Sequence, residues 1–204
     1  MNVRSNDNSA EDKKVLIMEC AMELFVKEGF QQTSMALLSK ESGVATGTIY
    51  HHFKGKDDLI ESTYLYVSEQ MGQSLLFKEN ELEWSYEERF KLMWMRSYQY
   101  LVDHPKYFYF KDTLNYSPLI SPDLKQKANV YFEASLALIQ EGIDLGLFAQ
   151  KNVEILGLWI HNTVISAVQA TLFGQIDQTD DQLQHFYVMT WTGLTKTNAK
   201  IEKP

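Results

Sequence analysis

The segment of about residues 34–53 constrains the fold most, because it leaves room for only two short helices with a tight turn between them. Thr33 or Ser34 can cap the first helix, since a hydroxyl oxygen accepts hydrogen bonds from the free N–H groups at a helix start. Gly43 follows, and glycine adopts positive φ without steric cost. A second helix fits residues 46–52. With a longer helix before it, this segment predicts a helix-turn-helix.

The longer helix is predicted over residues 11–28, followed by Gly29 as its C-terminal cap. Its apolar residues recur on one helical face, namely Ile17, Cys20, Ala21, Leu24 and Phe25. Cys20 is the only cysteine, so an intramolecular disulfide and a zinc site of several thiolates are excluded. We interpret Cys20 as a small core residue.

The rest of the chain also has helical signals and no strand alternation. Four prolines and ten glycines among 204 residues leave long stretches uninterrupted. Further helices are predicted from Lys56, from the capping box Ser85-x-x-Glu88, from Pro105, from Ser121 to about Gly142, from Asn152 to Gly174, and from Thr179-x-x-Gln182. The predicted fold is all-α with about nine helices.

The second short helix carries side chains that suit contact with a nucleic acid. They are small or form hydrogen bonds, as in Ala45, Thr46, Gly47, Thr48, Tyr50 and His51. Small residues let a backbone approach a phosphate, while Tyr and His reach phosphate oxygens and base edges. The charge balance argues the other way: the net charge is −8, and residues 1–60 carry seven Lys or Arg against nine Asp or Glu.

Residues 15–59 resemble the DNA-binding domain of the TetR family of bacterial transcriptional regulators. The resemblance is carried by Ala21-x-x-Leu24-Phe25, Gly29-Phe30-x-x-Thr33-Ser34, Ser42-Gly43-Val44, Gly47-Thr48-Ile49-Tyr50-His51-His52-Phe53 and Lys56-x-x-Leu59. The chain departs from the family at Ala45, where a capping Ser is usual, and at Thr46, where Lys is frequent. Loss of the cap costs about 1 kcal/mol at the helix end.

The resemblance implies a three-helix helix-turn-helix domain over residues 11–71, whose fourth helix is shared with the next domain. It implies a helical ligand-binding and dimerisation domain over residues 72–204. The positions that match the family's DNA contacts are Thr33, Ala45, Thr46, Gly47, Thr48, Tyr50, His51 and Lys56. The implied function is a repressor, acting as a homodimer on a palindromic double-stranded operator and released by a small apolar or amphipathic effector.

The last two predicted helices are too apolar for the surface of a monomer. Their apolar residues fall on more than one face, which favours burial of the second face against a partner chain. A charge on such a face, for example at Val168, should then break the dimer.

The aromatic residues predict a pocket with apolar walls. Its walls would be drawn from Trp84, Tyr86, Phe90, Trp94, Tyr98, Phe108, Phe110, Phe132 and Trp159. No motif assigns particular ligand-binding residues.

Other classes of function have less support. His51 and His52 point about 100° apart on a helix and cannot chelate one metal together, and no other histidine has a partner at ligand spacing. We therefore expect no metal, no cofactor and no catalytic residues, and no enzyme activity.

We expect a cytoplasmic protein without a membrane span, because the sequence has no run of eighteen uncharged apolar residues and its N-terminus is polar. The alternative is a helical small-molecule binding or sequestering protein with weakened DNA binding, which the acidic charge, Ala45 and Thr46 favour.

Overall fold

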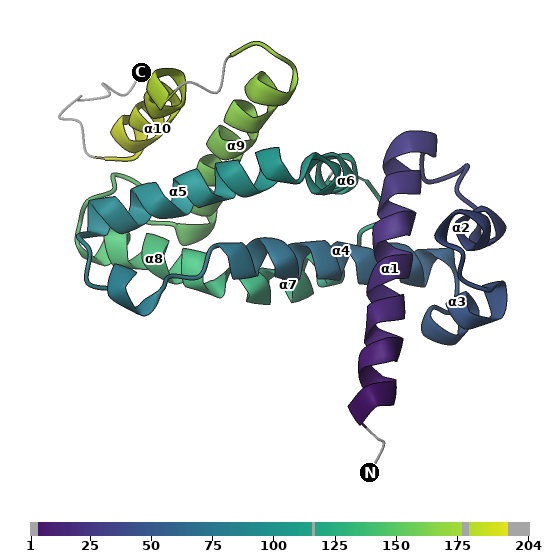
Figure 1. Ribbon diagram of the computed structural model, residues 1–204. Helices are drawn as coiled ribbons and strands as arrows, with labels where there is room; N and C mark the ends of the chain where they lie inside the picture. Colours follow the sequence, from purple (N-terminus) through teal and green to yellow (C-terminus); the bar gives the residue numbers. More distant parts are fainter. Residues whose placement is uncertain (1–3, 116, 177–179, 196–204) are drawn as a thin grey trace. The chain divides into compact units, whose positions relative to one another are not determined.

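The computed structural model describes residues 4–115, 117–176 and 180–195. These residues form α-helices and two short 3-10 helices, with no strand among them, which confirms the predicted all-α fold. The α-helices are α1 (Arg4–Glu28), α2 (Met35–Ser42), α3 (Thr46–His52), α4 (Lys56–Ser74), α5 (Tyr86–Asp103), α6 (Pro105–Asn115), α7 (Pro122–Asn129), α8 (Glu133–Asp144), α9 (Val153–Leu172) and α10 (Asp180–Leu194) (Figure 1).

Most helix ends lie where the capping residues predict them. The Ser34 hydroxyl accepts from the Leu37 N–H at 3.1 Å, and Asn152 caps α9 through the N–H groups of Glu154 and Ile155. Glycines end α1 and α2 at positive φ, 86° at Gly29 and 68° at Gly43. The predicted cap Thr179 lies outside the described residues.

One predicted helix is divided in two. The segment from Ser121 to about Gly142 forms α7 and α8, with the 3-10 helix η2 (Val130–Phe132) between them. A β-branched residue followed by two aromatic ones has low helix propensity, because these side chains lose rotamer freedom against the preceding turn. The backbone of Tyr131 also lies so close to Gly72 that a Cβ at Gly72 would sit 2.1 Å from its carbonyl oxygen.

The chain divides into two compact units. The first comprises Met1–Gln70 and His104–Val130, so it holds α1, α2, α3, α6, α7 and most of α4. The second comprises Met71–Asp103 and Tyr131–Pro204, with α5, α8, α9 and α10. The predicted boundary after residue 71 assigns α6 and α7 to the second domain, whereas the packing groups them with the helix-turn-helix.

The core of the first unit is built on α1, which packs against α2, α3 and α6. Ile17 and Ala21 are fully buried on the predicted apolar face, and Phe25 stacks on Phe30 with ring centres 4.9 Å apart. Cys20 lies at the edge of this face and is half-buried. Burial raises the pKa of its thiol, which favours the unreactive protonated form.

A polar cluster formed by Glu19, Tyr66, Lys106 and Tyr107 joins three helices of this unit. The Glu19 carboxylate of α1 accepts hydrogen bonds from the hydroxyls of Tyr66, at 3.0 Å, and of Tyr107, and pairs with Lys106 Nζ at 2.6 Å. Burial alone would raise the pKa of Glu19. The hydrogen bonds from Lys106, Tyr107 and Tyr66 outweigh burial and hold this pKa below its usual range.

The second unit has an aromatic core in which α5 packs against α8, α9 and α10. Trp94 is fully buried, stacks on Tyr98 and donates its indole N–H to Thr163 Oγ1 at 3.1 Å. The aromatic residues predicted to line one pocket are dispersed instead. Phe108 and Phe110 lie in the core of the first unit, whereas Trp84 and Trp159 are exposed. The sequence does not reveal which of these aromatic residues belong to which core, because helices of both units carry apolar stripes.

α9 has one buried face and one exposed apolar face. Leu158 is 62% exposed, whereas Val168 is fully buried within the chain. A charged substitution at Val168 would therefore disrupt the core of this chain and not an interface with a second chain.

α9 is also long and apolar enough, with a mean hydropathy of 1.3, to satisfy the length and composition test for a membrane span. Its buried face packs against α5, α8 and α10.

The Glu19 cluster predicts an acid-dependent loss of stability. Glu19→Gln should destabilise the protein at neutral pH by about 1–2 kcal/mol, because it removes the charge from hydrogen bonds that remain partly exposed to water. Since the folded-state pKa is lowered, the charged form stabilises the fold above the unfolded pKa, and this contribution is lost as pH falls through the folded value. Urea unfolding from about pH 7 to about pH 3 should show wild type and variant converging. A constant difference would contradict this.

Gly72 predicts a second effect on stability. Gly72→Ala should destabilise the second unit by about 1–3 kcal/mol, because its methyl group meets the Tyr131 carbonyl. Gly47→Ala is the matched control, since no atom lies within 4 Å of a Cβ there. Denaturant unfolding, followed by circular dichroism, measures the stability of both variants. Equal unfolding midpoints for Gly72→Ala and Gly47→Ala would show that the contact with Tyr131 does not lower the free energy of unfolding.

Candidate nucleic-acid interface

The turn between α2 and α3 is held by side chains that hydrogen-bond to the backbone. Ser39 Oγ donates to the Val44 carbonyl at 2.8 Å, and Ser42 Oγ donates to the Leu38 carbonyl at 2.6 Å. The Val44 N–H in turn donates to Ser42 Oγ at 3.2 Å. With Gly43 at positive φ, these bonds fix the direction in which α3 leaves the turn. Ser39 was not identified from the sequence, because a serine inside a helix carries no distinctive signal.

α3 is anchored on one face and exposed on the other. Ile49 is fully buried and Phe53, directly after the helix, is 1% exposed. Tyr50 is 53% exposed, and Thr46 and His51 are exposed on the same short helix. The tyrosine side chain is therefore free to contact a partner and contributes little to the core.

The glycine of α3 has no packing role inside the chain. A Cβ built on Gly47 has no neighbouring heavy atom within 4 Å, although glycine lowers helix stability by about 0.5–1 kcal/mol relative to alanine. Such a residue in an exposed helix suits close approach by another molecule. Thr48 beside it is half-buried.

The start of α3 lacks the side-chain cap that most helices have. Ala45 is the N-cap residue and is exposed, and its carbonyl accepts from the N–H groups of Thr48 at 2.8 Å and Ile49 at 3.1 Å. Its methyl side chain can accept no hydrogen bond. The N–H groups of the first turn therefore receive no cap from this residue, as its departure from the family pattern implies.

Two of the predicted contact residues use their polar groups inside the chain. The Thr33 hydroxyl is buried and donates to the Gly29 carbonyl at 2.9 Å. Lys56 Nζ donates to the Phe30 carbonyl at 2.9 Å, across the turn between α1 and α2. Both side chains hold this turn, and Lys56 is half-exposed whereas Thr33 is buried. Spacing in the sequence cannot reveal this, because the bond from Lys56 spans 26 residues.

Lys54 is a further cation beside α3, outside the set of contact residues predicted from the sequence. Its side chain is exposed, and it forms no ion pair with the described residues. The Asp58 carboxylate instead accepts from the Lys54 backbone N–H at 2.7 Å. The position of Lys54 directly after the apolar Phe53, which is buried, is the sequence signal that could have identified it. Across the described residues, no group of three metal-ligating side chains occurs.

Comparisons with known proteins agree with this geometry. Residues 17–63 match the sequence model described as bacterial regulatory proteins, tetR family. An uncharacterized HTH-type transcriptional regulator of Haemophilus influenzae is 27% identical over 173 residues, which cover 85% of this chain and 90% of the relative. A fatty acid metabolism regulator protein of Bacillus subtilis is 27% identical over 82% of this chain and 81% of its own length.

A solved structure also has the same fold. The transcriptional regulator FadR from Bacillus subtilis, in complex with stearoyl-CoA, superimposes with a TM-score of 0.69 at 20% identity, covering 88% of this chain and 98% of that one. The family match lies on α1 to α4, where the structure has a helix-turn-helix. The helix-turn-helix of this chain is that of the TetR family of bacterial transcriptional regulators.

Proposed function

We propose that the protein is a cytoplasmic, non-enzymatic repressor that binds a palindromic operator as a homodimer and is released by a small apolar or amphipathic effector. The observation that carries the proposal is α3. Ile49 anchors it in the core, Tyr50 and His51 are exposed, and Gly47 leaves open space for a duplex. A helix of this kind enters the major groove in helix-turn-helix proteins.

Within this proposal the residues have different parts. The exposed side chains of Thr46, Tyr50 and His51 contact phosphates or base edges, and Gly47 permits the close approach. Thr48 and the exposed Ala45 lie at the margin of the contact. Lys54 adds a phosphate contact that was not predicted. Thr33 and Lys56 act by holding the turn between α1 and α2, so the proposed contribution of their polar groups is positional.

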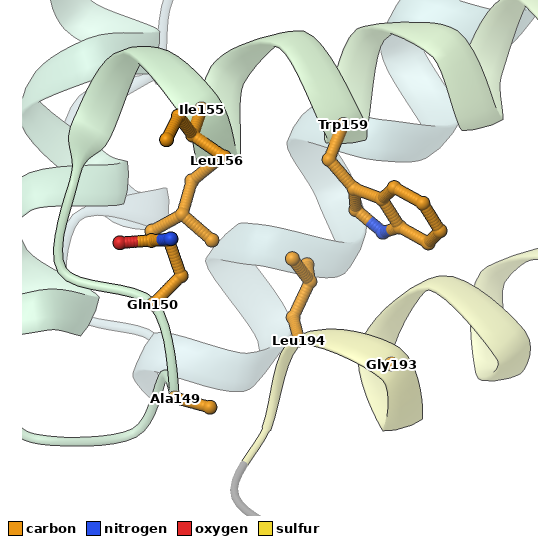
Figure 2. Close-up of a pocket in the computed structure, with 7 residues that line it drawn as sticks. All are labelled: Ala149, Gln150, Ile155, Leu156, Trp159, Gly193 and Leu194. Atoms are coloured by element: carbon orange, nitrogen blue, oxygen red, sulfur yellow. The ribbon is translucent and has the colours of Figure 1, made fainter. Parts of the chain in front are cut away.

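The proposed dimer uses the exposed faces of α9 and α10. Their large apolar side chains that remain exposed are Ile155, Leu158, Trp159, Val188 and Met189. An open pocket of about 220 Å³ lies at this face. In Figure 2, Trp159 of α9 lies opposite Gly193 and Leu194 at the end of α10. Ile155 and Leu156 also line it. An exposed apolar surface of this kind favours burial against a second chain.

The comparisons support an effector of amphipathic character. One relative bears the name of a regulator of fatty acid metabolism, and one structure of the same fold holds stearoyl-CoA. The competing proposal, a sequestering protein with weakened DNA binding, is favoured by the uncapped start of α3 and the net charge of −8. Retardation of the DNA flanking the gene separates the two proposals, since only a repressor retards it specifically.

The first prediction from this proposal concerns α3. Tyr50→Ala combined with His51→Ala should abolish specific retardation, because two exposed hydrogen-bonding side chains are lost, while helicity and molecular size stay unchanged. Tyr50→Phe keeps the ring and removes the hydroxyl, so it should weaken binding by about tenfold, as expected for one hydrogen bond of about 1–2 kcal/mol. Operator binding by the double variant at wild-type affinity would show that α3 is not the recognition helix.

The second prediction concerns assembly. Leu158→Glu should convert the dimer to folded monomers at micromolar concentration, because it places a charge in the proposed interface without disturbing the core. Val168→Glu, on the buried face of the same helix, should instead lose helicity. Sedimentation velocity and circular dichroism distinguish the results. A wild-type protein that sediments as a monomer would rule out both the interface and binding to a palindrome as a dimer.

A further inference from the structure

A lysine of the first unit lies in surroundings unusual for a cation. Lys111 of α6 is half-buried as a side chain, but its ammonium end is buried against α4. Nζ lies 3.5 Å from the centre of the Tyr64 ring and donates to Ser68 Oγ at 2.8 Å. Ser68 Oγ itself donates to the Tyr64 carbonyl at 2.7 Å, so it offers Lys111 only a lone pair.

A second lysine approaches the same place from α7. Lys125 Nζ donates to the carbonyl of Asn115, one helical turn beyond Lys111 on α6, at 2.6 Å. Burial, and after it the positive charge of Lys125, lower the pKa of Lys111 to about 7. Tyr64, whose ring lies beneath Lys111 Nζ, has a pKa raised by burial, so it stays neutral. Two cations thus come together in a protein whose net charge is −8.

The acceptors around Lys111 do not match its donors. An ammonium group has three N–H donors. One is directed to Ser68 and one to the ring of Tyr64, and no carboxylate of the described residues forms an ion pair with Lys111 or Lys125. A buried cation without a counter-ion is costly, and protein interiors normally pair it.

We infer that Lys111, assisted by Lys125, binds the anionic head group of the effector between α4, α6 and α7. The chemistry shared by a carboxylate and a phosphate fits this site, since either supplies a charge and the missing acceptor. The inference rests on the proposed function and adds the chemical class of the effector: an acidic amphiphile rather than a neutral one.

The position of this subsite also gives a route to α3. Lys111 lies one helical turn after Tyr107, which belongs to the Glu19 cluster and is hydrogen-bonded to α1. α1 in turn packs against α2 and α3. An anion that draws Lys111 away from Ser68 would therefore alter the contacts of α6 with α4 and, through Tyr107, with α1.

The test compares three probes that share one chain length: decanoate, decyl phosphate and decan-1-ol. Calorimetry with the full-length wild type should give at least tenfold tighter binding for one or both anions than for the alcohol. Which anion is preferred identifies the carboxylate or the phosphate as the head group. Lys111→Met should bind all three with equal affinity, whereas Lys127→Met, an exposed lysine on α7, should keep the wild-type preference.

A second readout is the proton that binding takes up. At about pH 8 Lys111 is largely neutral when its pKa is about 7, and a bound anion favours its charged form. Binding of the anion should therefore take up close to one proton in the wild type and none in Lys111→Met, as measured in Tris and in HEPES. Folding of the variant is checked by thermal unfolding, where removal of the buried charge should raise the melting temperature near pH 6.

Several results would overturn the inference. They are equal affinity for the anions and the alcohol in the wild type, an anion preference that Lys111→Met retains, or no measurable binding of any probe. Operator retardation is measured on the same samples. If the wild type retards the operator and the anion preference is absent, the inference fails and the proposed repressor stands. If retardation is absent, the proposed function itself fails, whatever the probes bind.

Discussion

Burial of one face of α1 is the constraint on which the first unit depends. Ile17 and Ala21 are fully buried there, and α1 is the helix against which α2, α3 and α6 all pack. Burial of Ile49 fixes the rotation of α3 about its own axis, because the helix cannot turn without exposing this side chain to water. The outward direction of Tyr50 follows from that rotation, so the proposed DNA-binding surface is a consequence of core packing.

The polar contacts of α1 add a second function to the same helix. Glu19 binds side chains of α4 and α6, and Lys106 reaches both Glu19 and Glu23. These are charge-assisted bonds with defined directions, unlike apolar contacts, which tolerate small shifts. If α6 is displaced, the bonds from Lys106 and Tyr107 to α1 must therefore break or move α1 with them. In the proposed mechanism, the effector provides the free energy for this step through its different affinity for the two conformers.

The candidate site was predicted in part from local signals. The turn at Gly43, the cap at Ser34 and the short second helix depend on residues within a few positions of one another, so the sequence reveals them. The internal bonds of Thr33 and Lys56 were missed, because they depend on the path of the chain between α1 and α4. The buried Lys111 gave no sequence signal either, since a lysine on a helix is normally solvated.

By itself the sequence determined the helical class, most helix boundaries and the location of the helix-turn-helix. These follow from periodicity, capping residues and glycine turns, which act over less than two helical turns. Only the tertiary structure decided that α6 and α7 belong to the same compact unit as the helix-turn-helix. It also decided that Val168 is buried whereas Leu158 is exposed, and that the aromatic residues are divided between two cores. These properties depend on which of several apolar helix faces meet, and similar stripes on different helices do not specify their partners.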